Sequence, residues 1–396
     1  MSIANYISKS MEESSWIRKM FEEGMRLKEK LGEENVFDFS IGNPDLRPPD
    51  EFFDAIKEIC FKPKANCFIN EHGYMSNAGY PETREAVAVK VSEDYGVPIT
   101  GDFIVMTCGA AGGLNVVLKT LLNPGEEVIV PKPYFFEYTP YINNHNGIIT
   151  FVETNQDFSL NIENINSAIN KKTKAVLINS PNNPTGKVYS EKEIKELAKL
   201  LNDRYKNNGR VIYLINDESY RELVYDGVKI PSILKYYNNS ITVTSLSKTL
   251  SLAGERIGFI TVNPSCDDTN TLMSGLIICN RILGYINAPA LMQRVIAKIL
   301  NKSVDINIYK RKRDLFINGL VNAGYQVEKP DGAFYIFPKS PIKDDVGFVR
   351  HLLKYNILAV PGVGFLGPGY FRLSYAVPEE VIARSFSKFK EAIESI

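Results

Sequence analysis

Hydrophobic and polar positions follow one clear rhythm in the middle of this chain. Between about residues 81 and 285, helical segments separate short runs that are rich in β-branched residues. This alternation is typical of βαβ units, which build a mostly parallel sheet covered by helices on both faces. Right-handed crossovers then place the carboxyl ends of the strands along one edge. The expected strands are Phe103–Thr107, Glu127–Val130, Ile148–Val152, Ala175–Asn179, Val211–Ile215 and Ile241–Thr244.

The two ends of the chain follow a different pattern. Apolar residues at helical spacing predict a helix over Ser14–Leu31, and Val36–Phe39 is expected to form a short strand. After about residue 285, two helical stretches precede three short strands, which favours a smaller α+β domain joined by the N-terminal segment. We predict an N-terminal segment over residues 1–49, a large domain over 50–285 and a small domain over 286–396. The expected elements of the small domain are Pro289–Leu300, Asp305–Ala323, Ala333–Phe337, Ile357–Val360 and Phe371–Ser374.

The composition is that of a chain that can bury a large core. The 396 residues are 44% hydrophobic and 23% charged, and 46 basic residues balance 46 acidic ones. A net charge of zero provides no basic field for nucleic acid or an anionic membrane, so a small molecule is the expected partner. No apolar run approaches the ~20 residues that a membrane span needs.

The cysteines and the N-terminal residues indicate a compartment. Five scattered cysteines without a CxxC pair predict neither a disulfide framework nor a metal site, and favour reduced thiols in the cytoplasm. Glu12 and Glu13, without a long apolar stretch, predict that no signal peptide is present.

The segment with the strongest chemical pattern follows the strand expected at Ile241–Thr244. Here Ser245 and Ser247 flank Lys248, and Arg256 lies eight residues further on. A lysine that forms a Schiff base needs surroundings that lower its pKa, because the free amine is the nucleophile. Hydroxyl groups and a guanidinium suit a nearby phosphate. A solvated lysine in a polar loop is the alternative interpretation of this segment alone.

A carboxylate and a phenol follow the apolar strand expected at Val211–Ile215. Asp217 would be buried at the end of this strand and would need a cationic partner, such as the protonated ring nitrogen of a cofactor. Tyr220 could then donate a hydrogen bond to a hydroxyl group of the same ring. The alternative is an aspartate that caps the next helix.

Two further loops after expected strands can present ligand-binding groups. The loop Ser180–Gly186 contains two X-Pro steps that make it rigid, so that the amide of Asn183 can face a ligand. In the loop Cys108–Gly113, small residues allow a phosphate to approach backbone N–H groups at the start of a helix. This second loop matches neither the dinucleotide fingerprint nor the P-loop. Each loop could also be an ordinary turn.

An arginine interrupts the half-apolar strand Phe371–Ser374 in the predicted small domain. A bidentate clamp on a substrate carboxylate would explain Arg372 at this position. An arginine that faces solvent from an edge strand is the alternative.

Together and in this order, the five segments resemble the class I/II aminotransferases, pyridoxal-phosphate (PLP) enzymes of fold type I. The match runs from about Ser40 to Ala376. The resemblance implies an α/β fold with a mostly parallel seven-stranded sheet in the large domain and a smaller α+β domain. It implies an enzyme that transfers an amino group from an L-amino acid to a 2-oxo acid by a ping-pong mechanism. It also implies a homodimer with shared active sites.

The resemblance further implies a role for each residue. Lys248 would bind PLP as an aldimine and shuttle a proton, Asp217 would pair with the pyridinium nitrogen, and Tyr220 and Asn183 would hold the ring hydroxyl. Phe135, rather than Tyr134, would stack on the ring. The groups expected around the phosphate are Gly109, Ala110, Ala111, Ser245, Ser247 and Arg256.

The substrate and the neighbouring subunit would use other residues. Arg372 would bind the α-carboxylate, assisted by Asn183 and the backbone N–H of Gly42, and Tyr74 would reach the phosphate bound by the neighbouring subunit. Two positions depart from the family pattern. Ala111 stands where many relatives have a hydroxyl or a lysine, and Arg281 lies about one residue from the place where some members bind acidic substrates. Aspartate specificity is therefore not predicted.

Two alternatives share most of these motifs. One is a PLP-dependent C–S β-lyase on the same scaffold, and the other is a non-catalytic PLP-binding regulatory module. The second requires a DNA-binding domain, and the segment before Gly42 is too short for one. The three histidines, His72, His145 and His351, lie near no motif, and no catalytic role is expected for them.

Overall fold

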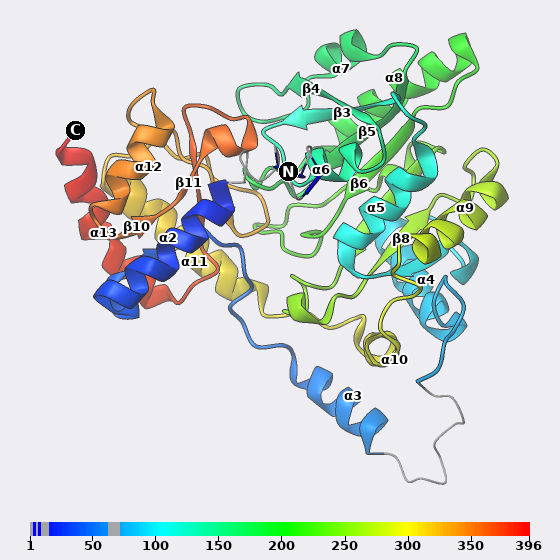
Figure 1. The fold of residues 1–396 in the computed structure, drawn as a ribbon, viewed down its shortest axis with the longest axis horizontal. Helices are drawn as coiled ribbons and strands as arrows, with labels where there is room; N and C mark the ends of the chain where they lie inside the picture. The colour runs from blue at the N-terminus through cyan, green and yellow to red at the C-terminus, as the bar shows by residue number, and fades with distance from the viewer. Residues whose placement is uncertain (1–2, 5–6, 9–15, 62–71) are drawn as a thin grey trace.

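A seven-stranded sheet forms the centre of the larger part of the molecule (Figure 1). Its strand order is β2-β8-β7-β6-β5-β3-β4, and only β8 runs antiparallel to its neighbours. The predicted α/β fold with a mostly parallel seven-stranded sheet is confirmed. The strands are β2 (Ile104–Thr107), β3 (Glu127–Lys132), β4 (Ile148–Glu153), β5 (Thr173–Asn179), β6 (Tyr213–Asp217), β7 (Ser240–Ser245) and β8 (Gly258–Val262).

The structure is a computed structural model that describes residues 3–4, 7–8, 16–61 and 72–396. All six strands predicted in the larger part are present, with ends shifted by one or two residues. Strand β8 was not predicted, because it follows β7 without an intervening helix and breaks the βαβ rhythm. The helix predicted over Ser14–Leu31 is described from Trp16 onward, so its expected first residues lie outside the described part, as does Cys67.

Helices cover both faces of this sheet because its strands are apolar on both sides. In β3, Val128 and Val130 face the layer formed by α5, α6 and α9, whereas Ile129 faces the layer that contains α4, α8 and α10. This is the period of two that a strand buried on both faces requires. The helices are α3 (Asp50–Cys60), α4 (Pro81–Tyr95), α5 (Gly109–Leu121), α6 (Tyr138–Asn143), α7 (Ile162–Ala168), α8 (Glu191–Asn208), α9 (Thr269–Ile282) and α10 (Ala290–Ile299).

The smaller part combines the N-terminal helix with about the last quarter of the chain (Figure 1). Strand β1 pairs in parallel with β10, and a separate antiparallel sheet has the order β11-β12-β9. Residues 357–361 therefore form two strands, where the sequence predicted one. The elements are α2 (Trp16–Leu31), β1 (Phe37–Asp38), α11 (Ile306–Asn322), β9 (Tyr335–Ile336), α12 (Asp345–Leu353), β10 (Ile357–Leu358), β11 (Val360–Pro361), β12 (Phe371–Ser374) and α13 (Glu379–Glu394).

The hydrophobic clusters describe how the two parts are held together. Met20, Phe37 and Phe39 from the N-terminal segment pack with the apolar residues of α11, α12 and α13. Helix α10, however, contributes Met292 and Val295 to the cluster beneath the large sheet. The change from one cluster to the other thus falls after α10, and the predicted domain boundaries stay predictions.

The helices and the cysteines indicate whether the chain has a membrane span or disulfide bonds. Among the described residues, no helix combines the length and the apolar character that a membrane span needs. The cysteines described, Cys60, Cys108, Cys266 and Cys279, are free thiols.

Candidate active site

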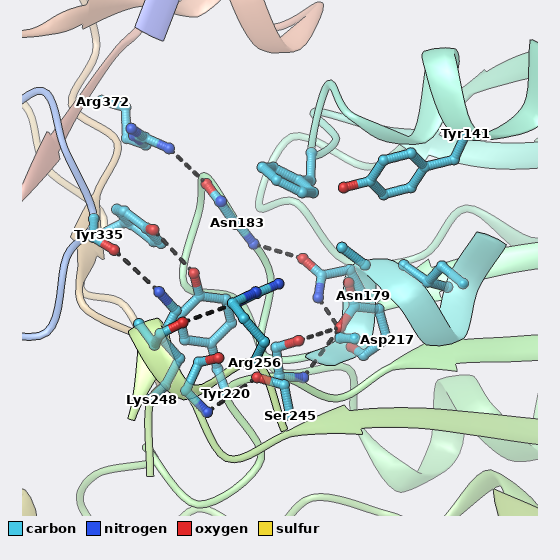
Figure 2. A pocket seen from close by; sticks show the side chains of 18 residues that line it. Tyr141, Asn179, Asn183, Asp217, Tyr220, Ser245, Lys248, Arg256, Tyr335 and Arg372 are labelled. Atoms are coloured by element: carbon cyan, nitrogen blue, oxygen red, sulfur yellow. Dashed lines mark hydrogen bonds between the residues drawn. The ribbon is translucent and has the colours of Figure 1, made fainter. Parts of the chain in front are cut away.

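One cavity lies where the carboxyl ends of β5, β6 and β7 meet the start of α5 and the smaller part (Figure 2). Its volume is about 290 Å³. Carboxyl ends of parallel strands form the usual ligand-binding edge of such a sheet. The residues that line it are Gly42, Ala110, Ala111, Leu114, Phe135, Tyr141, Asn179, Asn183, Asp217, Ser219, Tyr220, Ser245, Ser247, Lys248, Ala253, Arg256, Tyr335 and Arg372.

Lys248 enters this cavity from the turn that follows β7. Its Nζ donates a hydrogen bond of 3.1 Å to the carbonyl oxygen of Gly42. Burial, together with the positive charges of Arg256 and Arg372, lowers the pKa of the Lys248 amine to about 8, while Asp217 opposes the shift. Near neutral pH, a much larger share of this amine is therefore unprotonated than of an ordinary lysine.

Asp217 is the last residue of β6, and its carboxylate is buried. Oδ1 accepts hydrogen bonds from the backbone N–H and the hydroxyl of Ser219, at 3.1 and 2.7 Å, and Oδ2 accepts one of 2.8 Å from the hydroxyl of Tyr138. Burial raises the pKa of Asp217, and these hydrogen bonds oppose the shift. In the described part of the chain, Asp217 forms no ion pair with lysine or arginine. The site thus holds a carboxylate that a cationic ligand atom would stabilise.

Helix α5 presents its amino end beside Arg256. Gly109, its first residue, has a φ of +71°, and a Cβ added there would lie 2.9 Å from an Nη atom of Arg256. The preceding residue, Cys108, makes no side-chain capping bond, so the first N–H groups of the helix remain available for an anion. Arg256 itself has a left-handed backbone with φ of 52°, a conformation that non-glycine residues adopt mainly under local constraint.

Arg372 lies in β12 and is 1% exposed. Its two terminal nitrogens donate to the carbonyl oxygen of Ser40 at 2.7 Å and to the side-chain oxygen of Asn183 at 3.0 Å. No carboxylate pairs with it in the described residues, and its Nε has no hydrogen-bond partner there. Burial lowers the pKa of the guanidinium. A buried guanidinium with a free donor is suited to a carboxylate ligand.

The other residues predicted from the sequence fall into two groups. Tyr220, Asn183, Phe135, Ser245, Ser247 and Gly42 line the cavity, together with Ala110 and Ala111. Gly109 does not line it but abuts Arg256. Tyr134 lies outside the lining, with its hydroxyl 2.7 Å from that of Thr139.

Tyr74 and Arg281 lie away from the cavity. The side chain of Tyr74 is 94% exposed, and Arg281 is exposed on α9. His145 and His351 also lie away from the cavity. His145 contacts Asn115, and His351 lies against the end of α13. The structure therefore brings together the predicted lysine, carboxylate and both arginines, and leaves Tyr74 on the surface.

Three tyrosines in the site were missed by the sequence analysis. Tyr138 bonds Asp217, Tyr141 lines the cavity, and the hydroxyl of Tyr335 lies 2.9 Å from that of Tyr220. Tyr138 and Tyr141 follow Phe135 by three and six residues, so helical spacing after Phe135 was a usable signal. No comparable signal exists for Tyr335, which comes from the smaller part.

Comparisons with known proteins agree with this geometry. The sequence pattern of the aminotransferase class I and II family matches residues 34–389. The chain is 31% identical over 394 residues to the aspartate aminotransferase of Thermotoga maritima, covering 98% of this chain and 97% of the relative. A crystal structure of an amino transferase from Eubacterium rectale is similar with a TM-score of 0.96 and 39% identity, covering 100% and 99% of the two chains. An aspartate aminotransferase from Thermus thermophilus with maleate has a TM-score of 0.84 and 27% identity, covering 96% and 97%.

The fold and this lysine-centred cavity define a PLP-dependent enzyme of fold type I. The chain belongs to the class I and II aminotransferase family. It is an enzyme that exchanges an amino group between amino acids and 2-oxo acids, with PLP as its cofactor. Amino-group transfer is therefore favoured over both the C–S β-lyase and the regulatory module.

The residues of the cavity fit PLP. Among the described residues Asp217 has no ion-pair partner, so the ring nitrogen of the cofactor would supply its cation, and the uncapped amino end of α5 beside Arg256 would bind the phosphate as its anion. The amine of Lys248, whose pKa is lowered, lines the same cavity as Asp217 and Arg256 (Figure 2).

Proposed function

We propose that this aminotransferase works with Lys248 as the group that holds PLP and moves the substrate proton. The bound cofactor supplies an electron-withdrawing ring that makes the α-hydrogen of an attached amino acid acidic. The lowered pKa of Lys248 supports its role, because a neutral amine is both the nucleophile that captures an aldehyde and the base that accepts a proton.

Asp217 is proposed to hold the ring nitrogen in its protonated form. Its carboxylate is aimed by Ser219 and Tyr138 and has no competing cation among the described residues. A fixed negative charge in a site of low polarity stabilises an adjacent positive charge strongly. Tyr220 and Asn183 are proposed to bind the ring hydroxyl, and Phe135 to stack on the ring.

The phosphate is proposed to lie at the amino end of α5. Backbone N–H groups and a helix dipole favour an anion there, and Arg256 adds a positive charge. The residues proposed to surround the phosphate are Gly109, Ala110, Ala111, Ser245, Ser247 and Arg256.

Arg372 is proposed to bind the α-carboxylate of the substrate. Its unpartnered Nε and its lack of a carboxylate partner support this role, as does its bond to Asn183. Gly42 is proposed to assist with its backbone N–H. The carbonyl of Gly42 already accepts a hydrogen bond from Lys248, so this residue lies beside the reacting amine.

We also propose a homodimer in which Tyr74 completes the partner's site. The 94% exposure of this phenol, away from the cavity of its own chain, supports a contact with a second copy. Sedimentation of the active enzyme tests the assembly, and a fully active monomer would overturn it. The names of the relatives suggest aspartate as one amino donor, whereas Ala111 provides no cation for a second carboxylate, so we propose no single donor.

The convergence of Lys248, Asp217, Arg256 and Arg372 on one cavity is the observation that carries the proposal. Replacement of Lys248 by alanine should abolish turnover and the visible absorbance of the protein-bound cofactor. The matched control is Lys388→Ala, at an exposed lysine, which should leave both unchanged. The assay follows oxo-acid formation with and without an added acceptor. Normal turnover of the Lys248 variant would remove the assignment, and product formation that needs no acceptor would indicate a lyase.

A further inference from the structure

Tyr335 lies at the point where the cavity meets the smaller part of the molecule. Strand β9 pairs with β12, and Tyr335 stands opposite Ser374, two residues from Arg372. Side chains two residues apart on a strand share one face, so the ring of Tyr335 is a diagonal neighbour of the arginine. The centre of the Tyr335 ring is 4.5 Å from the guanidinium carbon, and the ring of Phe365 lies 4.8 Å from the same carbon. Two aromatic rings thus flank the guanidinium of Arg372.

The hydroxyl of the same tyrosine reaches the cofactor side of the cavity. It lies 2.9 Å from the hydroxyl of Tyr220, and both side chains are buried. It is also packed so closely against Gly42 that a Cβ there would overlap it. Tyr335 therefore contacts both Arg372, which is proposed to bind the substrate carboxylate, and Tyr220, which is proposed to bind the ring hydroxyl of the cofactor (Figure 2).

We propose that Tyr335 is a positioning residue with two separable actions, in which its ring holds the guanidinium of Arg372 and its hydroxyl directs that of Tyr220. This inference rests on the roles proposed for Arg372 and Tyr220. No carboxylate neutralises Arg372 in the described residues, so the electron-rich faces of Tyr335 and Phe365 stabilise its charge before substrate binds, together with the hydrogen bonds to Ser40 and Asn183. Either hydroxyl can donate in this pair; when a ligand accepts from Tyr220, Tyr335 donates to the Tyr220 oxygen and strengthens the hydrogen bond that Tyr220 donates in turn.

The two actions can be separated by two substitutions. Tyr335→Phe keeps the ring and removes only the hydroxyl, so KM for amino acids should stay within about twofold, because the aromatic face beside the guanidinium of Arg372 remains in place. The hydrogen bond from Tyr220 stabilises the form of the bound cofactor that has lost its proton. Its weakening should therefore move the pH midpoint of the cofactor absorbance upward by roughly half a pH unit.

Tyr335→Met keeps much of the volume and removes the aromatic face as well. It should show the same shift of the pH midpoint and, in addition, raise KM for amino acids about tenfold. The inhibition constant of a simple monocarboxylic acid should rise by a similar factor, because that ligand needs the carboxylate clamp alone.

Tyr325 offers a matched control in the core of the smaller part. It is a buried tyrosine whose hydroxyl donates a 3.0 Å hydrogen bond to the carbonyl oxygen of Phe389. Tyr325→Phe and Tyr325→Met should move neither the pH midpoint nor KM. If the Tyr325 variants change both quantities as much as the Tyr335 variants do, general loosening explains the effects and the inference is overturned.

Two reference variants separate this inference from the proposed function. Tyr220→Phe should shift the midpoint and Arg372→Ala should raise KM. If they do so while both Tyr335 variants behave as wild type, the positioning role is wrong and the proposed function stands. If the reference variants also have no effect, the proposed function itself is wrong. Should Tyr335→Met not fold, Tyr335→Phe still tests the hydroxyl through the absorbance titration.

Discussion

Buried charged side chains in the cavity differ from those around it, because the surrounding ones form ion pairs and those of the cavity form none in the described residues. Asp217 and Glu218 are consecutive residues at the end of β6, and both carboxylates are buried. Glu218 lies 3.2 Å from Arg221 and also accepts a hydrogen bond from Asn216, whereas Asp217 receives bonds from neutral donors alone in the described residues. Neighbouring residues of a strand point to opposite faces of the sheet. The ion pair of Glu218 with Arg221 therefore lies on the face of the sheet away from the cavity, and the carboxylate of Asp217 faces the cavity.

Arginines and lysines of the smaller part repeat this contrast. Arg313 and Arg372 are each 1% exposed, but Arg313 pairs with Asp226 and Asp314 at 2.7 Å, while Arg372 has no carboxylate partner among the described residues. Lys312 is likewise buried against Asp45. A buried charge without a counter-charge costs free energy that a fold does not recover by itself. Asp217 and Arg372, which have no counter-charge in the described residues, therefore locate the site where a charged ligand binds.

The first test substitutes the two consecutive carboxylates. Asp217→Asn should lower kcat/KM roughly a thousandfold, because the ring nitrogen loses its counter-charge, without lowering the free energy of unfolding of the cofactor-free protein. Glu218→Gln should lower the stability of the protein and leave kcat/KM almost unchanged. It leaves the buried Arg221 without its carboxylate and should lower the free energy of unfolding by about 3 kcal/mol, while the folded enzyme keeps most of its activity.

Steady-state kinetics and urea unfolding of both variants measure this crossed effect. A comparable loss of activity in both, or a comparable loss of stability, would show that the two carboxylates do not differ in role.

The second test follows the titration of the Lys248 amine. The pKa of Lys248 is lowered to about 8, so the folded protein releases this proton at a lower pH than the unfolded chain does. Between that value and the ordinary lysine range the unfolded state binds more protons, and stability should rise with pH. At pH 8 about half of the Lys248 amine is neutral, roughly a hundredfold more than for an ordinary lysine.

Pulse labelling of the cofactor-free protein with an amine-reactive reagent, read by mass spectrometry, checks this prediction. Modification of Lys248 should increase with a midpoint near pH 8. Lys312, a buried lysine whose amine pairs with Asp45, serves as the control for access of the reagent to a buried amine. A Lys248 profile that rises only above pH 10 would contradict the lowered pKa.

The sheet and much of the site could be predicted because both follow from local rules. Asp217 ends one parallel strand, Lys248 and Asn183 lie within four residues of the ends of two others, and the ends of parallel strands meet at one edge. The placement of Arg372 was harder to foresee, because it depends on how the smaller part packs over that edge. Here the oddity of an arginine in an apolar strand provided the signal.

Other features leave no trace in a periodic pattern. Strand β8 returns antiparallel beside β7 through a loop that also carries Lys248 and Arg256, so no α-helix separates the two strands and the βαβ rhythm does not mark β8. Tyr335 sits in a strand of two residues, too short for any alternation to be read. Its partners, Tyr220 and Gly42, are more than 100 residues away in the chain. Contacts of this kind are set by tertiary packing, which single-sequence patterns do not encode.

The last test compares the two arginines. Arg372→Ala should raise KM for amino acids roughly thirtyfold, because a charge-assisted bond to the substrate carboxylate contributes about 2 kcal/mol. The affinity for PLP should change far less, since Arg256 and α5 are the groups proposed at the phosphate. Stability should not fall much either, because the substitution removes a buried charge that has no carboxylate partner in the described residues.

Arg313→Ala is the matched control, at equal burial and in the same part of the molecule. It removes the ion pairs of Arg313 with Asp226 and Asp314 and its hydrogen bond to the carbonyl oxygen of Pro330. Both carboxylates are partly exposed and keep lysine partners, so the free energy of unfolding should fall by about 1 to 2 kcal/mol while KM of the folded enzyme stays within twofold. Kinetics over a range of amino-acid concentrations and thermal unfolding measure both variants. An unchanged KM for the Arg372 variant would mean that the free Nε binds something other than the substrate, and the contrast between paired and unpaired charges would then no longer locate the carboxylate site.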